Sequence, residues 1–213
     1  QAQQVHRRVP VGSPATHQVC CQRLRPPPQR RRGVPQQVGD VGVAATGRQG
    51  GQIAADVVAA LEAAIRPETR LVITVSPTNP YLYCVDLEKI IHVTKPHRRI
   101  KVMIDSTFAT PVNYRPLEFG VDIVVHSATK YLAGHNDVLG GLVAGPSHLT
   151  SLFRETRGVL GAVLDPHAAF LIARGMKTLG LRIARQNQTA TQLAQVLEKH
   201  PKLSKVFYPA LPS

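Results

Sequence analysis

Short apolar runs alternate with stretches of helix-forming residues from about residue 52 to the end of the chain. The runs are continuous rather than alternating, which is typical of strands buried on both faces of a parallel sheet. Strands are predicted at residues 71–75, 101–104, 122–125 and 141–144. Helices are predicted at 53–65, from 87 to 92 or slightly beyond, from 165 through 172, and from about 179 to 198. This order predicts an α/β domain with a mostly parallel sheet and flanking helices.

Boundary residues support these elements. Asp86 and Asp165 stand where helix N-caps are expected, and Gly120 follows a short helical turn at 116–119. Pro201 ends the last long helix, after which residues 206–208 look like the opening strand of a further unit. The chain from residue 147 onward is otherwise expected to be mostly helical.

The first 51 residues have a different composition. Residues 1–50 contain eight Arg and one acidic residue, but only one Leu and no Phe, Tyr, Trp or Ile. Three consecutive prolines at 26–28 forbid helix and sheet pairing there. We therefore expect a disordered, basic Gln/Arg/Pro-rich extension at 1–51, or misread sequence joined to a real gene. A basic arm for RNA or another polyanion is the alternative, which the lack of aromatic residues for base stacking disfavours.

Composition excludes several classes of protein. The chain of 213 residues has a net charge of +13, yet no apolar stretch long enough to cross a membrane. Three cysteines without a CxxC pair make neither a disulfide framework nor a zinc site, so no metal is expected, and Cys84 is expected in the core. The start of the chain lacks a secretory apolar segment. A cytoplasmic location is expected, with a plastid possible in a plant or alga.

Polar residues follow three of the predicted strands. These are residues 76–79, 105–107 and 127–130. Because the carboxyl ends of parallel strands share one edge of a sheet, we expect these residues to gather there. Lys130, at the rim of a partly desolvated pocket, would have a lowered pKa and act as an amine nucleophile.

Together these groups match the protein-side requirements of pyridoxal 5′-phosphate (PLP). The cofactor needs a lysine for its aldehyde, a carboxylate for its ring nitrogen and hydroxyls for its phosphate. Lys130, Asp105, and the Ser127 and Thr129 hydroxyls are the candidates. Taken singly, Lys130 could be a solvated loop lysine and Asp105 a turn or cap residue. The interpretation depends on their occurring together.

Residues 121–141, which run through His126-Ser127-Ala128-Thr129-Lys130, strongly resemble the cofactor-lysine signature of one family. This is the Cys/Met-metabolism family of PLP-dependent enzymes, also called the cystathionine γ-synthase-like family. The resemblance covers about residues 56–213, and three of its segments, 134–139, 168–172 and 174–179, look most like the γ-synthases of the family. It also includes the segments 60–67, 76–80, 104–111, 134–139, 168–172, 174–179 and 185–187.

The resemblance implies a role for each matching residue. Lys130 would be the catalytic residue, forming a Schiff base with PLP and later transferring a proton. Asp105 would keep the ring nitrogen protonated. Ser127 and Thr129 would bind the phosphate. Two further residues would complete the cofactor site, Asn79 near the 3′-oxygen and Thr107 beside the ring.

The implied reaction is γ-replacement, in which an activated homoserine ester loses its acyl group and cysteine adds to give cystathionine. This would make the protein a transferase of methionine biosynthesis and transsulfuration that acts on small amino-acid substrates. A cystathionine γ- or β-lyase, or a methionine γ-lyase, remains open within the family. A non-catalytic protein with a nucleic-acid-binding arm remains the alternative from another class. His126, His135, Arg174 and Arg182 are expected to be structural.

The sequence also departs from the family pattern. Val75 stands where the family usually has Glu, before the Ser-Pro-Thr-Asn-Pro segment. Residues 52–213 would form an incomplete large domain of the type I, aspartate aminotransferase-like fold, without the C-terminal small domain. Family members are homotetramers, and the N-terminal part that completes a neighbour's site has no counterpart here. We therefore expect a fragment with reduced or no activity.

Overall fold

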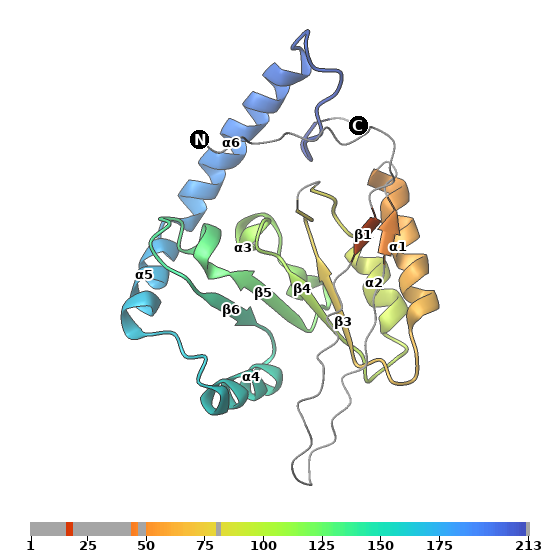
Figure 1. The fold of residues 1–213 in the computed structure, drawn as a ribbon, viewed down its shortest axis with the longest axis vertical. Helices are drawn as coiled ribbons and strands as arrows, with labels where there is room; N and C mark the ends of the chain where they lie inside the picture. Colours follow the sequence, from red (N-terminus) through yellow and green to blue (C-terminus); the bar gives the residue numbers. More distant parts are fainter. Residues whose placement is uncertain (1–15, 19–43, 47–49, 80–81, 212–213) are drawn as a thin grey trace, which may run out of the picture.

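The fold is that of a computed structural model, which describes residues 16–18, 44–46, 50–79 and 82–211. The described elements form an α/β arrangement in which helices flank a four-stranded sheet (Figure 1). A separate pair of short strands, β1 (Thr16–Gln18) and β2 (Ala44–Thr46), is antiparallel. Most of the predicted extension at 1–51 lies outside the described residues, and its boundary with the domain remains a prediction.

The main sheet has the order β3-β4-β5-β6. The first three strands are parallel, as predicted, and β6 runs antiparallel to β5, so the sheet is mixed. The strands are β3 (Leu71–Val75), β4 (Lys101–Asp105), β5 (Ile123–Ser127) and β6 (Gly141–Ala144).

The helices follow the predicted order, and two were not foreseen individually, the short α3 and the exposed α4. The α-helices are α1 (Gly50–Ala64), α2 (Leu87–Thr94), α3 (Thr110–Asn113), α4 (Ser147–Leu160), α5 (Pro166–Met176) and α6 (Leu179–Glu198). Two short helices of other types complete the described helical structure. They are the 3₁₀ helix η1 (Pro116–Phe119), which is wound more tightly than an α-helix, and the π-helix η2 (Ala128–Leu132), which is wound more widely.

Local chemistry sets several of these boundaries. The Asp86 carboxylate accepts the backbone N–H of Lys89 at 3.1 Å, and Asp165 accepts the N–H groups of the first turn of α5. Gly120 ends η1 with a φ of 90°, a conformation that glycine adopts without a steric cost. The strand expected at 206–208 is absent, since these residues pair with no other described strand.

One face of the sheet is closed by α1 and α2. Inward-facing residues of β3, β4 and β5 pack there against both helices, and Ile104 is completely buried. The cluster comprises Leu61, Val72, Leu87, Ile90, Ile100, Val102, Ile104, Val121 and Val124. Burial of this many aliphatic side chains supplies the main driving force for the fold of this layer.

The opposite face is only partly covered, which corrects the expectation that both faces are buried. Ile73 and Val75 on β3 and Val143 on β6 are each about two fifths exposed. Helix α4, next along the chain, has no buried residue. Asp105 lies on this half-open face, because it pairs with Val75 and Val125 and alternates with the buried Ile104.

A second apolar cluster lies where η2 meets α5 and α6, near the β6 side of the sheet (Figure 1). Its buried members are Ala128, Leu132, Ala133, Ile172, Leu179 and Ile183. Arg182 ties the cluster together by donating to the carbonyls of Tyr131, Leu132 and Gly175 at 2.9, 3.3 and 2.8 Å. This packing role matches the structural assignment that the sequence suggested for Arg182. None of the described helices could span a membrane.

Candidate active site

Three strand ends form a row at the carboxyl edge of the sheet. Val75 pairs with Asp105, and Asp105 pairs with Val125 on the other side. The polar segments that follow β3, β4 and β5 therefore begin side by side, as the strand pattern predicts. This edge is the candidate site.

Asp105 is fixed at the centre of that row. Its Oδ1 accepts the backbone N–H of Thr107 at 2.9 Å, and its carbonyl accepts the N–H of Ser76 at 3.1 Å. No described residue donates to Oδ2. The carboxylate is therefore held by its neighbour's backbone while one oxygen is left available for a ligand.

Thr107 links the ends of β4 and β5. Its hydroxyl oxygen accepts the backbone N–H of Ser127 at 2.8 Å. Through that bond, Thr107 fixes the end of the strand that carries Asp105 against the end of the strand that leads to Lys130. The hydroxyl of Ser127 itself contacts no described hydrogen-bond partner, so it is available to a ligand.

Thr129, whose hydroxyl is expected to bind the phosphate of PLP, makes hydrogen bonds within the chain. Its Oγ1 accepts the N–H of Gly140 at 2.9 Å and donates to the carbonyl of Gly140 at 3.3 Å. The backbone N–H of Thr129 also donates to that carbonyl, at 3.2 Å. Thr129 thus fastens the turn after β5 to the start of β6.

Lys130 lies in η2, the π-helical turn that follows β5. Its backbone leaves helical geometry, with φ −86° and ψ −117°, inside this turn. Wide turns of this kind occur frequently at functional sites. The Lys130 side chain is exposed and pairs with no described acid, so the partly desolvated pocket expected around it is not formed by the described residues.

Asn79, the last predicted cofactor residue, is exposed and makes no described side-chain hydrogen bond. The loop that precedes it is ordered by its neighbours. Ser76 Oγ accepts the N–H of Val85 at 3.2 Å, and Thr78 Oγ1 accepts the N–H of Tyr83 at 3.0 Å. The chain therefore positions the start of this loop firmly, and no described residue occupies the Asn79 amide.

His126 lies on the other face of the sheet from Asp105. It is 7 % exposed, and burial lowers the pKa of its imidazole, while nearby Asp105 and the Ser106 backbone act in the opposite direction. Its Nδ1 and the Ser106 hydroxyl are the buried polar side-chain atoms without a hydrogen-bond partner within the described ranges. A neutral, buried imidazole agrees with the structural role expected for it.

The expectations for Cys84, His135 and Arg174 have different outcomes. Cys84 is exposed, so its assignment to the core is wrong; it follows β3 in a loop rather than in a strand. His135 approaches the carbonyl of Ala133 at 2.7 Å through Nδ1, which agrees with a structural role. Arg174 lies 3.3 Å from the carboxylate of Asp137.

The donor set fits a PLP molecule. An exposed primary amine, a carboxylate with one free oxygen and a free serine hydroxyl follow neighbouring strands at one sheet edge. These groups match an aldehyde, a protonated ring nitrogen and a phosphate. The sequence did not reveal Gly140, whose backbone holds Thr129, because its role depends on a contact eleven residues away.

Comparison with known proteins gives a consistent result. The sequence pattern of the family described as "Cys/Met metabolism PLP-dependent enzyme" matches residues 43–213. Chloroplastic cystathionine γ-synthase 1 of Arabidopsis thaliana is 53 % identical over 158 residues, which are 73 % of this chain and 28 % of that protein. L-methionine γ-lyase of Porphyromonas gingivalis is 44 % identical over 155 residues, 72 % of this chain and 39 % of that protein.

A solved structure has the same fold. Cystathionine γ-lyase from Lactobacillus plantarum, complexed with L-serine, superposes with a TM-score of 0.70 at 40 % identity. The alignment covers 73 % of this chain and 41 % of that one. The chain thus spans well under half the length of these relatives.

Proposed function

The chain belongs to the family of PLP-dependent enzymes of Cys/Met metabolism, and from that membership we propose a cystathionine γ-synthase-like role for it. In this role cysteine replaces the acyl group of an activated homoserine ester. The observation that carries the proposal is the placement of Lys130 in the π-turn after β5, next to the strand that ends on Asp105.

The proposal assigns PLP to the carboxyl edge of the sheet. When bound, PLP supplies an electron sink for negative charge that develops on the substrate. Lys130 would hold its aldehyde carbon and afterwards move a proton at the substrate's carbon. Asp105 would hold the ring nitrogen protonated through the oxygen that no described residue occupies, while Thr107 keeps the other oxygen in place.

Ser127, Thr129 and Asn79 would complete the binding of the cofactor. The Ser127 hydroxyl is free to donate to a phosphate oxygen. Thr129 would exchange its long 3.3 Å contact with the carbonyl of Gly140 for a phosphate oxygen and keep the N–H of Gly140 as donor to its Oγ1. Asn79 would approach the ring's 3′-oxygen from the loop after β3.

The choice of γ-synthase over lyase is supported by sequence identity. The plant γ-synthases from Arabidopsis thaliana and Nicotiana tabacum share 53 % and 50 % identity with this chain, against 40–46 % for the lyases compared. The γ-synthase of Mycobacterium leprae, at 45 %, lies within the range of the lyases, so the support comes from the plant enzymes. A γ- or β-lyase or a methionine γ-lyase is the competing activity. The names of these plant relatives also favour a plastid over the cytoplasm, if the chain comes from a plant or alga.

We expect weak PLP binding and little turnover by the isolated chain. Lys130 is exposed, and the half-open face beside Asp105 leaves Val75 and Ile73 partly in contact with water. A high local dielectric weakens the electrostatic interactions on which this chemistry depends.

The test has a binding stage and a product stage. PLP added to the full chain should give the visible absorbance band of a lysine-bound cofactor, and Lys130→Ala should abolish it. Lys177→Ala, which removes another exposed lysine, is the matched control and should retain the band. An unchanged band in Lys130→Ala would refute the assignment.

For the product stage, the chain and a full-length relative are supplied with an acyl homoserine and cysteine. Cystathionine as the product supports γ-replacement. Release of a 2-oxo acid and ammonia instead would assign the chain to the lyases. Robust turnover by the isolated chain would overturn the expectation of weak activity.

A further inference from the structure

A basic cavity lies at the opposite edge of the sheet from the candidate active site. Its volume is about 280 Å³. Two loops line it, and each leads into the amino end of a parallel strand: 66–70 before β3 and 96–100 before β4. No role in the proposed reaction involves this edge. The lining residues are Arg66, Pro67, Thr69, Arg70, Pro96, His97, Arg98, Arg99 and Ile100.

The two loops are preorganised by short hydrogen bonds. Thr69 is 3 % exposed, and its hydroxyl accepts the N–H of Arg66 at 3.0 Å, while its own N–H donates to the carbonyl of Arg66 at 3.0 Å. In the second loop the N–H of Ile100 donates to the carbonyl of His97 at 2.8 Å. A bond of 2.8 Å from Lys101 N–H to the carbonyl of Arg70 joins the loops. The cavity is therefore framed by backbone that is held in place.

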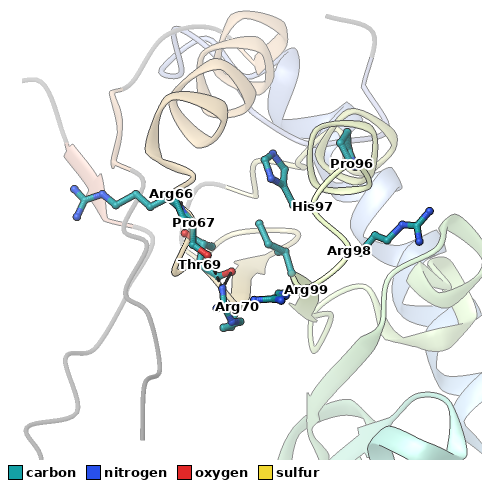
Figure 2. A pocket seen from close by; sticks show the side chains of 9 residues that line it. Arg66, Pro67, Thr69, Arg70, Pro96, His97, Arg98 and Arg99 are labelled. Carbon is teal, nitrogen blue, oxygen red and sulfur yellow. Dashed lines mark hydrogen bonds between the residues drawn. The ribbon is translucent and has the colours of Figure 1, made fainter. Parts of the chain in front are cut away.

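Four guanidinium groups surround this frame, and no carboxylate lines it. Arg70 donates to the carbonyls of Pro67 and Thr69 at 2.6 and 3.1 Å, which orients its side chain but does not neutralise its charge. Figure 2 shows the Arg99 side chain lying toward Arg70, whereas Arg66 and Arg98 point to opposite sides. The like charges of Arg70 and Arg99 repel each other across the cavity, so an anion between them would stabilise the arrangement.

Helix C-termini do not account for all of these cations. Helices α1 and α2 end just before the two loops, and cations are favourable near C-terminal carbonyls. Arg70 binds the carbonyls of Pro67 and Thr69, which lie in the loop beyond the end of α1. The side chains of Arg66, Arg98 and Arg99 donate to no carbonyl and pair with no acid in the described part of the chain. Within the described residues, nothing compensates these three charges.

We propose that this cavity binds a small multiply charged phosphate compound, such as one carrying a pyrophosphate group. Guanidinium forks match the paired oxygens of phosphate, and a single carboxylate would leave most of the positive charge unbalanced. A liquid water molecule occupies about 30 Å³, so the cavity has room for several heavy atoms of an anion. Apart from His97, no aromatic side chain lines the cavity, which favours a small anion over stacked nucleotide bases.

The test compares two variants that lose the same charge. Arg99→Gln removes a guanidinium that makes no described contact, and Arg154→Gln removes an exposed one in α4, away from the cavity. Calorimetric titration with inorganic pyrophosphate, without PLP, should show about tenfold weaker binding for Arg99→Gln than for the unaltered chain, as expected for loss of a charge-assisted hydrogen bond. Arg154→Gln should bind pyrophosphate like the unaltered chain.

Equal affinities for the two variants would overturn the proposal, because binding would then reflect general charge, including the arginine-rich first 50 residues. No measurable binding by the unaltered chain would overturn it as well. Tight binding of a single-stranded RNA that Arg99→Gln weakens and Arg154→Gln does not, with no binding of pyrophosphate, would assign the surface to nucleic acid instead. Because Arg99 lies at the opposite edge of the sheet from Lys130, the difference between the two variants does not depend on the proposed reaction.

Discussion

The contact between α5 and the turn that carries Lys130 gives a sharp prediction. Gly175 of α5 is buried against the backbone of Ala133, the residue that follows η2. A Cβ added at Gly175 would overlap the carbonyl oxygen of Ala133 and lie 2.7 Å from its carbonyl carbon. Backbone atoms cannot rotate away as a side chain can, so Gly175→Ala must displace α5 from the turn.

The expected change in the free energy of unfolding follows from two opposing effects. Overpacking of this kind costs about 1–3 kcal/mol, and a clash with backbone belongs at the upper end. Alanine gains about 1 kcal/mol over glycine from helix propensity. We therefore expect Gly175→Ala to lower the free energy of unfolding by about 2 kcal/mol.

Gly180→Ala in α6 is the matched control. Apart from the adjacent backbone of α6 itself, no heavy atom lies within 4 Å of the Cβ that this change would add, so only helix propensity applies. Urea unfolding followed by circular dichroism should show Gly180→Ala equal to, or up to about 1 kcal/mol more stable than, the unaltered chain.

The same displacement should reach the candidate site. Because Ala133 follows the turn that holds Lys130, Gly175→Ala should also weaken the absorbance band of bound PLP, whereas Gly180→Ala should not. If Gly175→Ala is as stable as the unaltered chain, the close approach of α5 to the turn is wrong and the reasoning fails.

Three further predictions concern stability. Ile104→Ala should cost about 2–5 kcal/mol in urea unfolding because Ile104 is completely buried, while Ile73→Ala on the half-open face should cost clearly less; equal losses would contradict the assignment of faces. Asp86→Ala should lower the free energy of unfolding by about 1 kcal/mol at pH 7, because the cap of α2 is lost. Because Lys89 lowers the pKa of Asp86, the difference between the two chains should shrink as the pH falls below 3.8. A difference that does not change with pH would argue against the cap. Burial lowers the pKa of His126, so the unfolded chain binds the proton more readily and the free energy of unfolding should fall as the pH drops through 6.5. His126→Asn should reduce this dependence of stability on pH. An equal dependence in the variant and the unaltered chain would show that His126 does not cause it.

Much of the fold was predictable because its signals are local. The apolar runs predicted all four strands of the main sheet, and Asp86 and Asp165 marked the helices that they cap. The row of polar strand ends was also predictable, since parallel strands place their carboxyl ends on one edge. The roles proposed for Lys130 and Asp105 came from this order, from the chemistry of an amine and a carboxylate, and from the family resemblance of residues 121–141.

Tertiary structure decided what depends on contacts between distant residues. No periodic pattern in the sequence predicts the exposed face around Val75 or the hydrogen bonds of Arg182 to three carbonyls. The same is true of the close approach of Gly175 to Ala133. Likewise, arginines from two loops some thirty residues apart form one cavity only because β3 and β4 are neighbours. The sequence by itself determined the four strands of the main sheet and most of the helices, and it supplied the candidate reactive groups, because these follow from the period and chemistry of adjacent residues. Which surfaces are covered, and which charges meet, was settled by packing.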